Sequence, residues 1–265
     1  MNEQDIRSRA TATKAQLTAA DRPAFEYSGV ARVAPDAPLA RYFDHTLLKP
    51  EATADQYRTL CEQAREYGTR SVCVPPDRVE LCSSLLEGSE VEVCTVIGFP
   101  LGYHTTSAKV TEVEMAASAG ATEFDMVIPI GRLREGDVNG VYDDVRAVVA
   151  AAGSQIVKVI LETALLADEQ KVDAAVAAVH AGAAILKTST GFSTAGATVE
   201  DIALFRLIAG EERGVKAAGG IRDLSFAQAC IAAGADRIGA SGTGSILDEA
   251  AGRSTPSKGT GGDSY

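Results

Sequence analysis

The sequence contains no tryptophan and has only three histidines and five cysteines. The cysteines are odd in number and none forms a C-x-x-C pair, so neither a disulfide framework nor a zinc site is expected. No two histidines have the spacing of metal ligands. We therefore predict no metal site, and a reducing, cytoplasmic setting fits the cysteine usage best.

Basic residues are also scarce. The chain has 25 Lys and Arg against 36 Asp and Glu, a formal net charge of -11. Nucleic acids and anionic membranes require a basic surface, so neither is expected as a partner. No apolar run approaches the roughly 20 residues of a membrane span, and the charged amino terminus does not resemble a secretory signal. A small phosphorylated substrate needs only a local anion site and is not excluded.

Composition divides the chain into three segments. Residues 1–38 are rich in Ala, Thr and charged residues and contain three prolines, which predicts a helical extension followed by a loop. Residues 39–251 repeat one pattern throughout. Residues 252–265 are rich in Gly, Ser and Thr and are expected to form a flexible carboxyl-terminal tail.

The repeated pattern is a short apolar or β-branched run followed by a segment with helical spacing of apolar residues. The runs lie at residues 39–48, 69–76, 91–100, 122–131, 155–163, 183–191, 214–220 and 236–241. Most are apolar on both faces, which is typical of a buried parallel sheet. Eight such alternations in one domain predict an α/β fold of the (β/α)8 TIM-barrel type, with a doubly wound open sheet as the alternative.

Two lysines and one aspartate lie within these apolar runs, namely Lys187, Lys216 and Asp125. Burying an unpaired ammonium costs several kcal/mol, so each lysine needs a partner or a function. Active-site residues of a barrel lie at the carboxyl ends of its strands, and inward positions alternate along each strand. The three side chains can therefore meet at the barrel mouth, where we predict an amine nucleophile and a proton-transfer partner.

This chemistry needs a neutral amine, whereas free lysine titrates at about pH 10.4. Partial desolvation and a nearby ammonium, supplied by Lys216, both lower the pKa of an attacking lysine. Lys187 would then form a Schiff base with a carbonyl, which lets an adjacent C–C bond break or form, while Asp125 moves protons directly or through a water. Lys158 either supports this proton transfer or pairs with Asp125 or Glu162. A buried structural ion network is the alternative for the whole set.

Glycine and hydroxyl residues follow the last three predicted strands. They are Ser189, Thr190 and Gly191, then Gly219 and Gly220, then the sequence GASGTG at 239–244. Loops after the last two strands of such a barrel commonly bind phosphate through backbone N–H groups and a helix amino terminus. We therefore predict a phosphate site there, with ordinary tight turns as the alternative. GASGTG is not a dinucleotide fingerprint, because it follows the last strand.

The segments FDHTLLKPEAT, EFDMVIPIG, KVILET, ILKTSTGF, VKAAGGIRD and RIGASGTG, in this order, resemble the 2-deoxyribose-5-phosphate aldolases from about Leu39 to Leu247. The combination of KTSTGF with KAAGGIR is highly specific. The resemblance implies a cofactor-free class I aldolase of deoxyribose phosphate catabolism. Such an enzyme reversibly cleaves 2-deoxy-D-ribose 5-phosphate to D-glyceraldehyde 3-phosphate and acetaldehyde. The resemblance also implies a homodimer or homotetramer.

The same resemblance assigns roles to individual residues. Lys187 matches the Schiff-base lysine, Lys216 the second lysine that lowers its pKa, and Asp125 the proton-transfer aspartate. The phosphate-binding positions correspond to Gly191, Gly219, Gly220, Ser241 and Gly242. Many relatives carry a second serine where this chain has Gly242, so one hydroxyl contact is lost. Family members often end in tyrosine, and Tyr265 is either a proton donor at the barrel mouth or without a role.

Two other functions stay open at this point. A different Schiff-base aldolase, transaldolase-like or specific for ketose phosphates, would turn over ketose phosphates and would not use acetaldehyde as a donor. A non-catalytic phosphate-binding barrel would bind sugar phosphates without forming an imine. The two intact lysines and the aspartate argue against the second of these.

Overall fold

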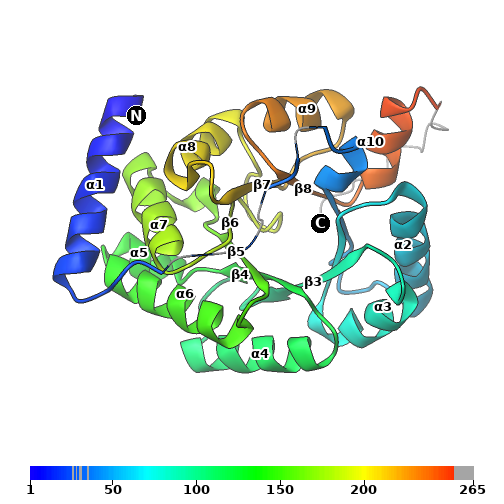
Figure 1. Cartoon of the computed structure of the whole chain (residues 1–265), viewed down its shortest axis with the longest axis horizontal. Helices are drawn as coiled ribbons and strands as arrows, with labels where there is room; N and C mark the ends of the chain where they lie inside the picture. Colours follow the sequence, from blue (N-terminus) through cyan, green and yellow to red (C-terminus); the bar gives the residue numbers. More distant parts are fainter. Residues whose placement is uncertain (26, 28, 30–31, 35, 254–265) are drawn as a thin grey trace.

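Eight parallel strands form a closed barrel in chain order, and β8 pairs back onto β1 (Figure 1). This computed structural model describes residues 1–25, 27, 29, 32–34 and 36–253. The strands are β1 (Phe43–Thr46), β2 (Ser71–Val74), β3 (Glu92–Ile97), β4 (Glu123–Val127), β5 (Ile156–Ile160), β6 (Ile185–Lys187), β7 (Gly214–Ala218) and β8 (Arg237–Ala240). The prediction of a TIM barrel is confirmed, and the alternative prediction of an open doubly wound sheet is wrong.

Helices surround the barrel and cover the outer faces of its strands (Figure 1). The α-helices after the extension are α2 (Ala54–Tyr67), α3 (Val79–Leu86), α4 (Thr106–Ser118), α5 (Ile130–Arg134), α6 (Val138–Ala152), α7 (Asp168–His180), α8 (Val199–Ala209), α9 (Leu224–Ala232) and α10 (Thr243–Ala250). Short 3-10 helices are η1 (Leu39–Tyr42), η2 (Pro76–Arg78) and η3 (Thr163–Leu165). Among the described residues, none of the helices is long and apolar enough to span a membrane.

Helix α6 illustrates how the sequence sets these elements. Asp137 caps its amino terminus, because the carboxylate accepts a hydrogen bond of 2.8 Å from the backbone N–H of Gly140. Val141, Val145 and Val148 recur at helical spacing and are fully buried. Each buried valine contributes about 1.5–3 kcal/mol relative to an exposed one. The helix is therefore fixed against the sheet that carries the site.

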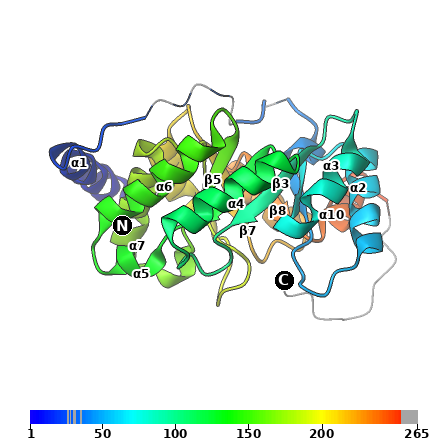
Figure 2. The same ribbon diagram turned by 90° about the horizontal axis from the view of Figure 1, so that it is seen from below.

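The amino-terminal extension contains the predicted helix, α1 (Glu3–Ala19), which packs against α7 on the outside of the barrel. The hydroxyl of Thr13 donates a hydrogen bond of 2.6 Å to Asp173 of α7, and Arg9 pairs with the same carboxylate. The described part of residues 20–38 then crosses the barrel end at which the strands begin (Figure 2). There, Arg32 pairs with Asp236, which immediately precedes β8. The opposite end, where the strands finish, is left for the active site.

Candidate active site

Lys187, Lys216 and Asp125 meet inside the barrel, as the sequence predicts. The ammonium groups of Lys187 and Lys216 each donate a hydrogen bond of 2.7 Å to Oδ2 of Asp125. The two lysines are directly paired in the register of β6 and β7. Asp125 and Lys216 are fully buried, whereas 3% of Lys187, the last residue of β6, is exposed. Lys187 is therefore the lysine of the pair nearest to the mouth.

Lys158 reaches the same carboxylate from β5. Its ammonium donates a hydrogen bond of 2.8 Å to Oδ1 of Asp125 and forms an ion pair of 2.7 Å with Glu123. The sequence offered Asp125 and Glu162 as alternative partners of Lys158. The structure confirms the pairing with Asp125, and the pairing with Glu162 is wrong. Glu162 instead accepts hydrogen bonds from the backbone N–H and the hydroxyl of Thr190. Lys158 thus contacts the proposed proton-transfer group and not the carboxylate beside the β6 loop.

Asp44, Glu123 and Arg237 complete a buried ionic network that the sequence analysis missed. Arg237 donates hydrogen bonds of 2.7 Å to Asp44 and 3.1 Å to Glu123. Asp44 in turn lies 2.6 Å from the ammonium of Lys216. Glu123 stands two residues before Asp125 on β4, and alternation along a strand places both side chains on the inner face. The two-residue spacing between Glu123 and Asp125 is the sequence signal that could have indicated that Glu123 also faces the barrel interior.

The network fixes the protonation of most of its members. Burial alone would raise the pKa of Asp125, but Lys158, Lys187 and Lys216 outweigh it and lower that pKa well below its ordinary value. Burial alone would lower the pKa of Lys216, but Asp125 and Asp44 raise it above the ordinary lysine value. The pKa of Lys158 is raised for the same reason, with Asp125 as the largest opposing influence. Lys158 and Lys216 therefore remain ammonium groups at neutral pH.

The three lysines differ in how many carboxylates each one contacts. Five cationic groups face the three carboxylates of Asp44, Glu123 and Asp125, an excess of positive charge; they come from Lys158, Lys187, Lys216, Arg237 and, at 3.8 Å from Glu123, Arg70. Within the described residues, Lys158 pairs with three carboxylates, Lys216 with two and Lys187 with one. Of the three lysines, Lys187 therefore has the fewest carboxylate partners among the described residues.

Cys73 and Cys94 line the barrel beside this network. The thiol of Cys94 donates to Oδ1 of Asp125 at 3.2 Å, and burial raises its pKa well above the ordinary value. The two sulfurs and an oxygen of Asp125 lie within 4.8 Å of one another, a spacing that could hold a metal ion. However, three ammonium groups already contact this carboxylate and would repel a cation. The donor set therefore does not fit a metal.

The predicted phosphate loops follow β6, β7 and β8. Gly219 has a φ of +85°, and a Cβ there would lie 2.9 Å from the Cα of Gly196 and 3.4 Å from that of Gly191. Only glycine allows this approach of the loops after β6 and β7. Gly220 lies in the loop between β7 and α9, and Ser241 and Gly242 precede α10, at the carboxyl ends of adjacent strands. The structure thus packs Gly191 against Gly219 and places the other three residues at neighbouring strand ends. Tyr265 lies outside the described residues.

Comparison with known proteins shows which family the chain resembles. Residues 39–251 match the family described as DeoC/LacD family aldolase. The deoxyribose-phosphate aldolases of Brevibacillus brevis and Streptococcus gordonii are each 54% identical to this chain over 209 residues, which cover 79% of this chain and 95% of the relative.

Solved structures extend the comparison to the fold. The tetrameric deoxyribose phosphate aldolase of Aeropyrum pernix superposes with a TM-score of 0.75 at 36% identity, covering 80% of this chain and 91% of that one. A crystal structure of a protein from Coccidioides immitis has a TM-score of 0.81 at 36% identity and covers 95% of this chain and 98% of that one. The second match is longer than the barrel alone, so it includes part of the amino-terminal extension.

Proposed function

Because the chain belongs to the DeoC/LacD family of aldolases, we propose that it is a class I aldolase that forms a Schiff base on Lys187. It reversibly cleaves 2-deoxy-D-ribose 5-phosphate to D-glyceraldehyde 3-phosphate and acetaldehyde, in deoxyribose phosphate catabolism. The observation that carries the residue assignment is the shared Oδ2 of Asp125, which accepts from both Lys187 and Lys216 at 2.7 Å. The relatives give no support to a ketose-phosphate aldolase or a non-catalytic barrel.

The first half of the reaction builds the imine. The neutral amine of Lys187 attacks the aldehyde carbon C1 of the open-chain sugar, and the resulting carbinolamine loses water. Lys216 remains charged beside the nucleophile and favours the neutral form of Lys187 by repulsion. Asp125, directly or through a water, moves the protons that this step requires. Lys158 keeps Asp125 ionised and oriented through its 2.8 Å hydrogen bond.

The second half breaks the carbon–carbon bond. A base, Asp125 or a water bound to it, takes the proton of the C3 hydroxyl, and the electrons of the C2–C3 bond flow into the iminium to give an enamine. D-glyceraldehyde 3-phosphate leaves at this point. Protonation of the enamine carbon and hydrolysis of the imine then release acetaldehyde and regenerate Lys187. No cofactor is needed, because the iminium itself accepts the electron pair.

The phosphate group is bound by the loops after β6, β7 and β8. Gly191, Gly219 and Gly220 offer backbone N–H groups, and Ser241 and Gly242 lie at the amino terminus of α10. A helix amino terminus carries partial positive charge and free N–H donors, which suits an anion. This arrangement holds the substrate by its unreactive end and presents its aldehyde carbon to Lys187.

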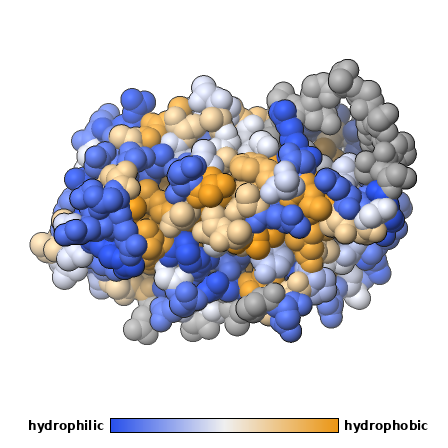
Figure 3. All heavy atoms as spheres, turned by 90° about the horizontal axis from the view of Figure 1, so that it is seen from above, coloured by the Kyte–Doolittle hydropathy of each residue, from blue (hydrophilic) through white to orange (hydrophobic). Residues whose placement is uncertain are grey.

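The remaining assignments concern the setting of the enzyme. We expect a cytoplasmic enzyme, since all five cysteines are free thiols. We expect self-association as a homodimer or homotetramer; the face over α8 and α9 shows a band of apolar side chains that a second copy would cover (Figure 3). Neither nucleic acid nor a membrane is expected as a partner, given the net charge of -11. Tyr265 is proposed as a proton donor.

Trapping the imine tests the proposed function. The protein is incubated with acetaldehyde and borohydride, and its intact mass is measured. Wild type is expected to gain one reduced two-carbon unit, whereas Lys187→Ala gains none. Lys14→Ala, at an exposed lysine of α1, is the matched control and should react like wild type. If wild type forms no adduct while a sugar phosphate still binds, the chain is instead a phosphate-binding barrel.

A further inference from the structure

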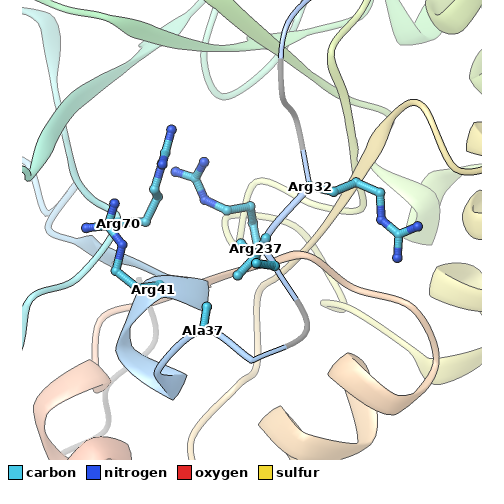
Figure 4. A pocket seen from close by; sticks show the side chains of 7 residues that line it. Arg32, Ala37, Arg41, Arg70 and Arg237 are labelled. Carbon is cyan, nitrogen blue, oxygen red and sulfur yellow. The ribbon is translucent and has the colours of Figure 1, made fainter.

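A cavity of about 170 Å³ lies at the end of the barrel opposite the mouth, beneath the described part of the extension. Its lining is unusually rich in arginine. The described lining residues are Arg32, Val33, Ala34, Ala37, Arg41, Arg70 and Arg237. Figure 4 shows Arg32 turned away from the other three arginines, which gather on one side of the cavity. None of the described lining residues carries a negative charge.

Two of these arginines are already neutralised by carboxylates. Arg237 is bound to Asp44 and Glu123, and Arg32 pairs with Asp236 and Glu211. The cavity therefore does not draw its excess charge from them. Their role is to build its walls, and Arg237, which is 2% exposed, forms the wall toward the barrel interior.

Among the described residues, Arg41 and Arg70 supply the charge that is compensated least. Arg41 donates a hydrogen bond of 3.1 Å to the backbone carbonyl of Thr69, which is neutral. Arg70 lies 3.8 Å from Glu123, beyond hydrogen-bond distance, and Glu123 is already held by Arg237 and by Lys158 at 2.7 Å. Two guanidinium groups thus border one cavity with donors to spare.

We propose that this cavity binds a phosphate group, as inorganic phosphate or a small phosphate monoester. The planar guanidinium presents paired N–H donors that match the oxygens of a tetrahedral oxyanion, and such charge-assisted hydrogen bonds are stronger than neutral ones. Half-enclosed walls reduce the competition from water and screening ions. The site is separate from the phosphate loops at the mouth and does not rest on the proposed function.

The location also connects the cavity to the active site. Arg237 contacts Asp44, and Asp44 contacts Lys216 at 2.6 Å. A second connection passes from Arg237 through Glu123 to Lys158. An anion in the cavity would therefore occupy the far end of the network that holds the lysines of the mouth.

Equilibrium dialysis with labelled inorganic phosphate, at ionic strength held constant with sodium chloride, tests the proposal. Wild type is compared with Arg41→Gln/Arg70→Gln. The matched control is Arg7→Gln/Arg58→Gln, which removes the same charge from side chains 62% and 52% exposed on α1 and α2. We expect the cavity variant to bind one phosphate fewer per chain, or to bind it at least tenfold more weakly, while the control matches wild type. Equal binding by all three proteins would overturn the proposal.

Two further measurements complete the test. A competition with glycerol 3-phosphate distinguishes the sources: displacement from the cavity indicates a monoester site, and displacement from the mouth alone indicates a site for the free ion. Crystals of wild type soaked in selenate guard against misfolding of the double variant. An anomalous peak between Arg41 and Arg70 supports the site, and a peak found at the mouth alone refutes it. Retained imine trapping would show that such a failure leaves the proposed function intact.

Discussion

Lys187 donates a hydrogen bond of 2.7 Å to Asp125, although they lie on β6 and β4, strands that are separated by β5. The contact therefore crosses the barrel interior and does not follow the sheet. Asp125 is fully buried, and two further ammonium groups share its carboxylate. Lys187, Lys216 and Asp125 therefore form one electrostatic unit, so a change at one residue affects the others.

Replacing Lys216 tests its influence on the nucleophile. Lys216→Met keeps the length of the side chain and removes its positive charge, which the raised pKa otherwise maintains across neutral and alkaline pH. Without that repulsion, Lys187 keeps its proton to a higher pH. We expect the rising limb of the pH–rate profile for cleavage to move up by about one unit or more, with a large fall in rate at pH 7. Lys14→Met is the control, and an unmoved limb would contradict the role of Lys216.

Asp125→Asn is expected to damage catalysis and stability together. The amide cannot exchange protons as the carboxylate does, so the cleavage rate should fall by about 10²–10⁴. Three ammonium groups lose their shared counter-ion, which should lower the free energy of unfolding by about 3–5 kcal/mol. Urea unfolding and a cleavage assay at low temperature measure the two effects separately. Asp143→Asn, at an exposed ion pair with Arg22, should change neither by much.

The acid sensitivity of the fold should depend on Glu123. Burial would raise its pKa, but Arg237 and Lys158 lower it to about 2 from 4.5. A lowered pKa in the folded state means that the stabilisation is present above pH 4.5 and is lost as the pH falls toward 2. The shift corresponds to on the order of 3 kcal/mol.

Urea unfolding of Glu123→Gln between pH 7 and pH 2.5 checks this expectation. The variant should be less stable at pH 7, because Arg237 and Lys158 lose a partner, but its stability should fall less steeply with acid. Glu90→Gln, at an exposed carboxylate, should follow the wild-type curve. A variant curve parallel to the wild-type curve would show that Glu123 does not titrate in this range.

The barrel and the inward positions of Lys187, Lys216 and Asp125 were predictable because the signals are local. Apolar runs with helical segments between them indicate the strands, and a lysine inside such a run indicates function regardless of its partners. The ionic network was not predictable in the same way, since Arg237 and Asp44 are 193 residues apart. Asp236 and Arg237 show the difficulty: they are adjacent, yet Asp236 binds Arg32 and Arg206 outside the barrel while Arg237 points inward.

The extension shows a similar limit. Its composition predicts a helix, and α1 is present. Nothing in residues 1–38, however, indicates that Arg9 will form an ion pair with Asp173 of α7 or that Thr13 will donate a hydrogen bond to it. The arginine cavity likewise depends on segments that meet only after the barrel closes. Arg41 precedes β1, Arg70 precedes β2 and Arg237 begins β8. Closure, not spacing, brings these side chains together.

Tyr265 lies outside the described residues, so its proposed role as a proton donor is tested by a rate measurement on a variant. Tyr265→Phe removes the phenol hydroxyl and keeps the ring. If that hydroxyl protonates the enamine, exchange of the methyl protons of acetaldehyde with deuterated water should slow by about 10²-fold, with imine trapping unchanged. Tyr103→Phe, at a phenol that is 75% exposed, is the control. An exchange rate equal to that of wild type would rule out the role.

The final prediction concerns the phosphate loops, where Gly242 and Gly219 differ in the space available for an added side chain. A Cβ at Gly242 meets nothing within 4 Å, and its φ of -85° is ordinary for any residue. Gly242→Ser should therefore fold like wild type and add a hydroxyl beside Ser241. A new hydrogen bond to a charged group contributes about 1.5–3 kcal/mol, so we expect KM for the sugar phosphate to fall about tenfold or more.

Gly219 has no such space. Its φ of +85° and the Cα of Gly196 at 2.9 Å make Gly219→Ala strained, so this variant should lose stability and raise KM. Gly242→Ala, which adds a Cβ without the hydroxyl, separates the two effects and should leave KM unchanged. Michaelis constants and melting temperatures of the three variants provide the measurement. If Gly242→Ser leaves KM at the wild-type value, phosphate does not reach this corner of the mouth, and the anion must be held by the loops after β6 and β7 alone.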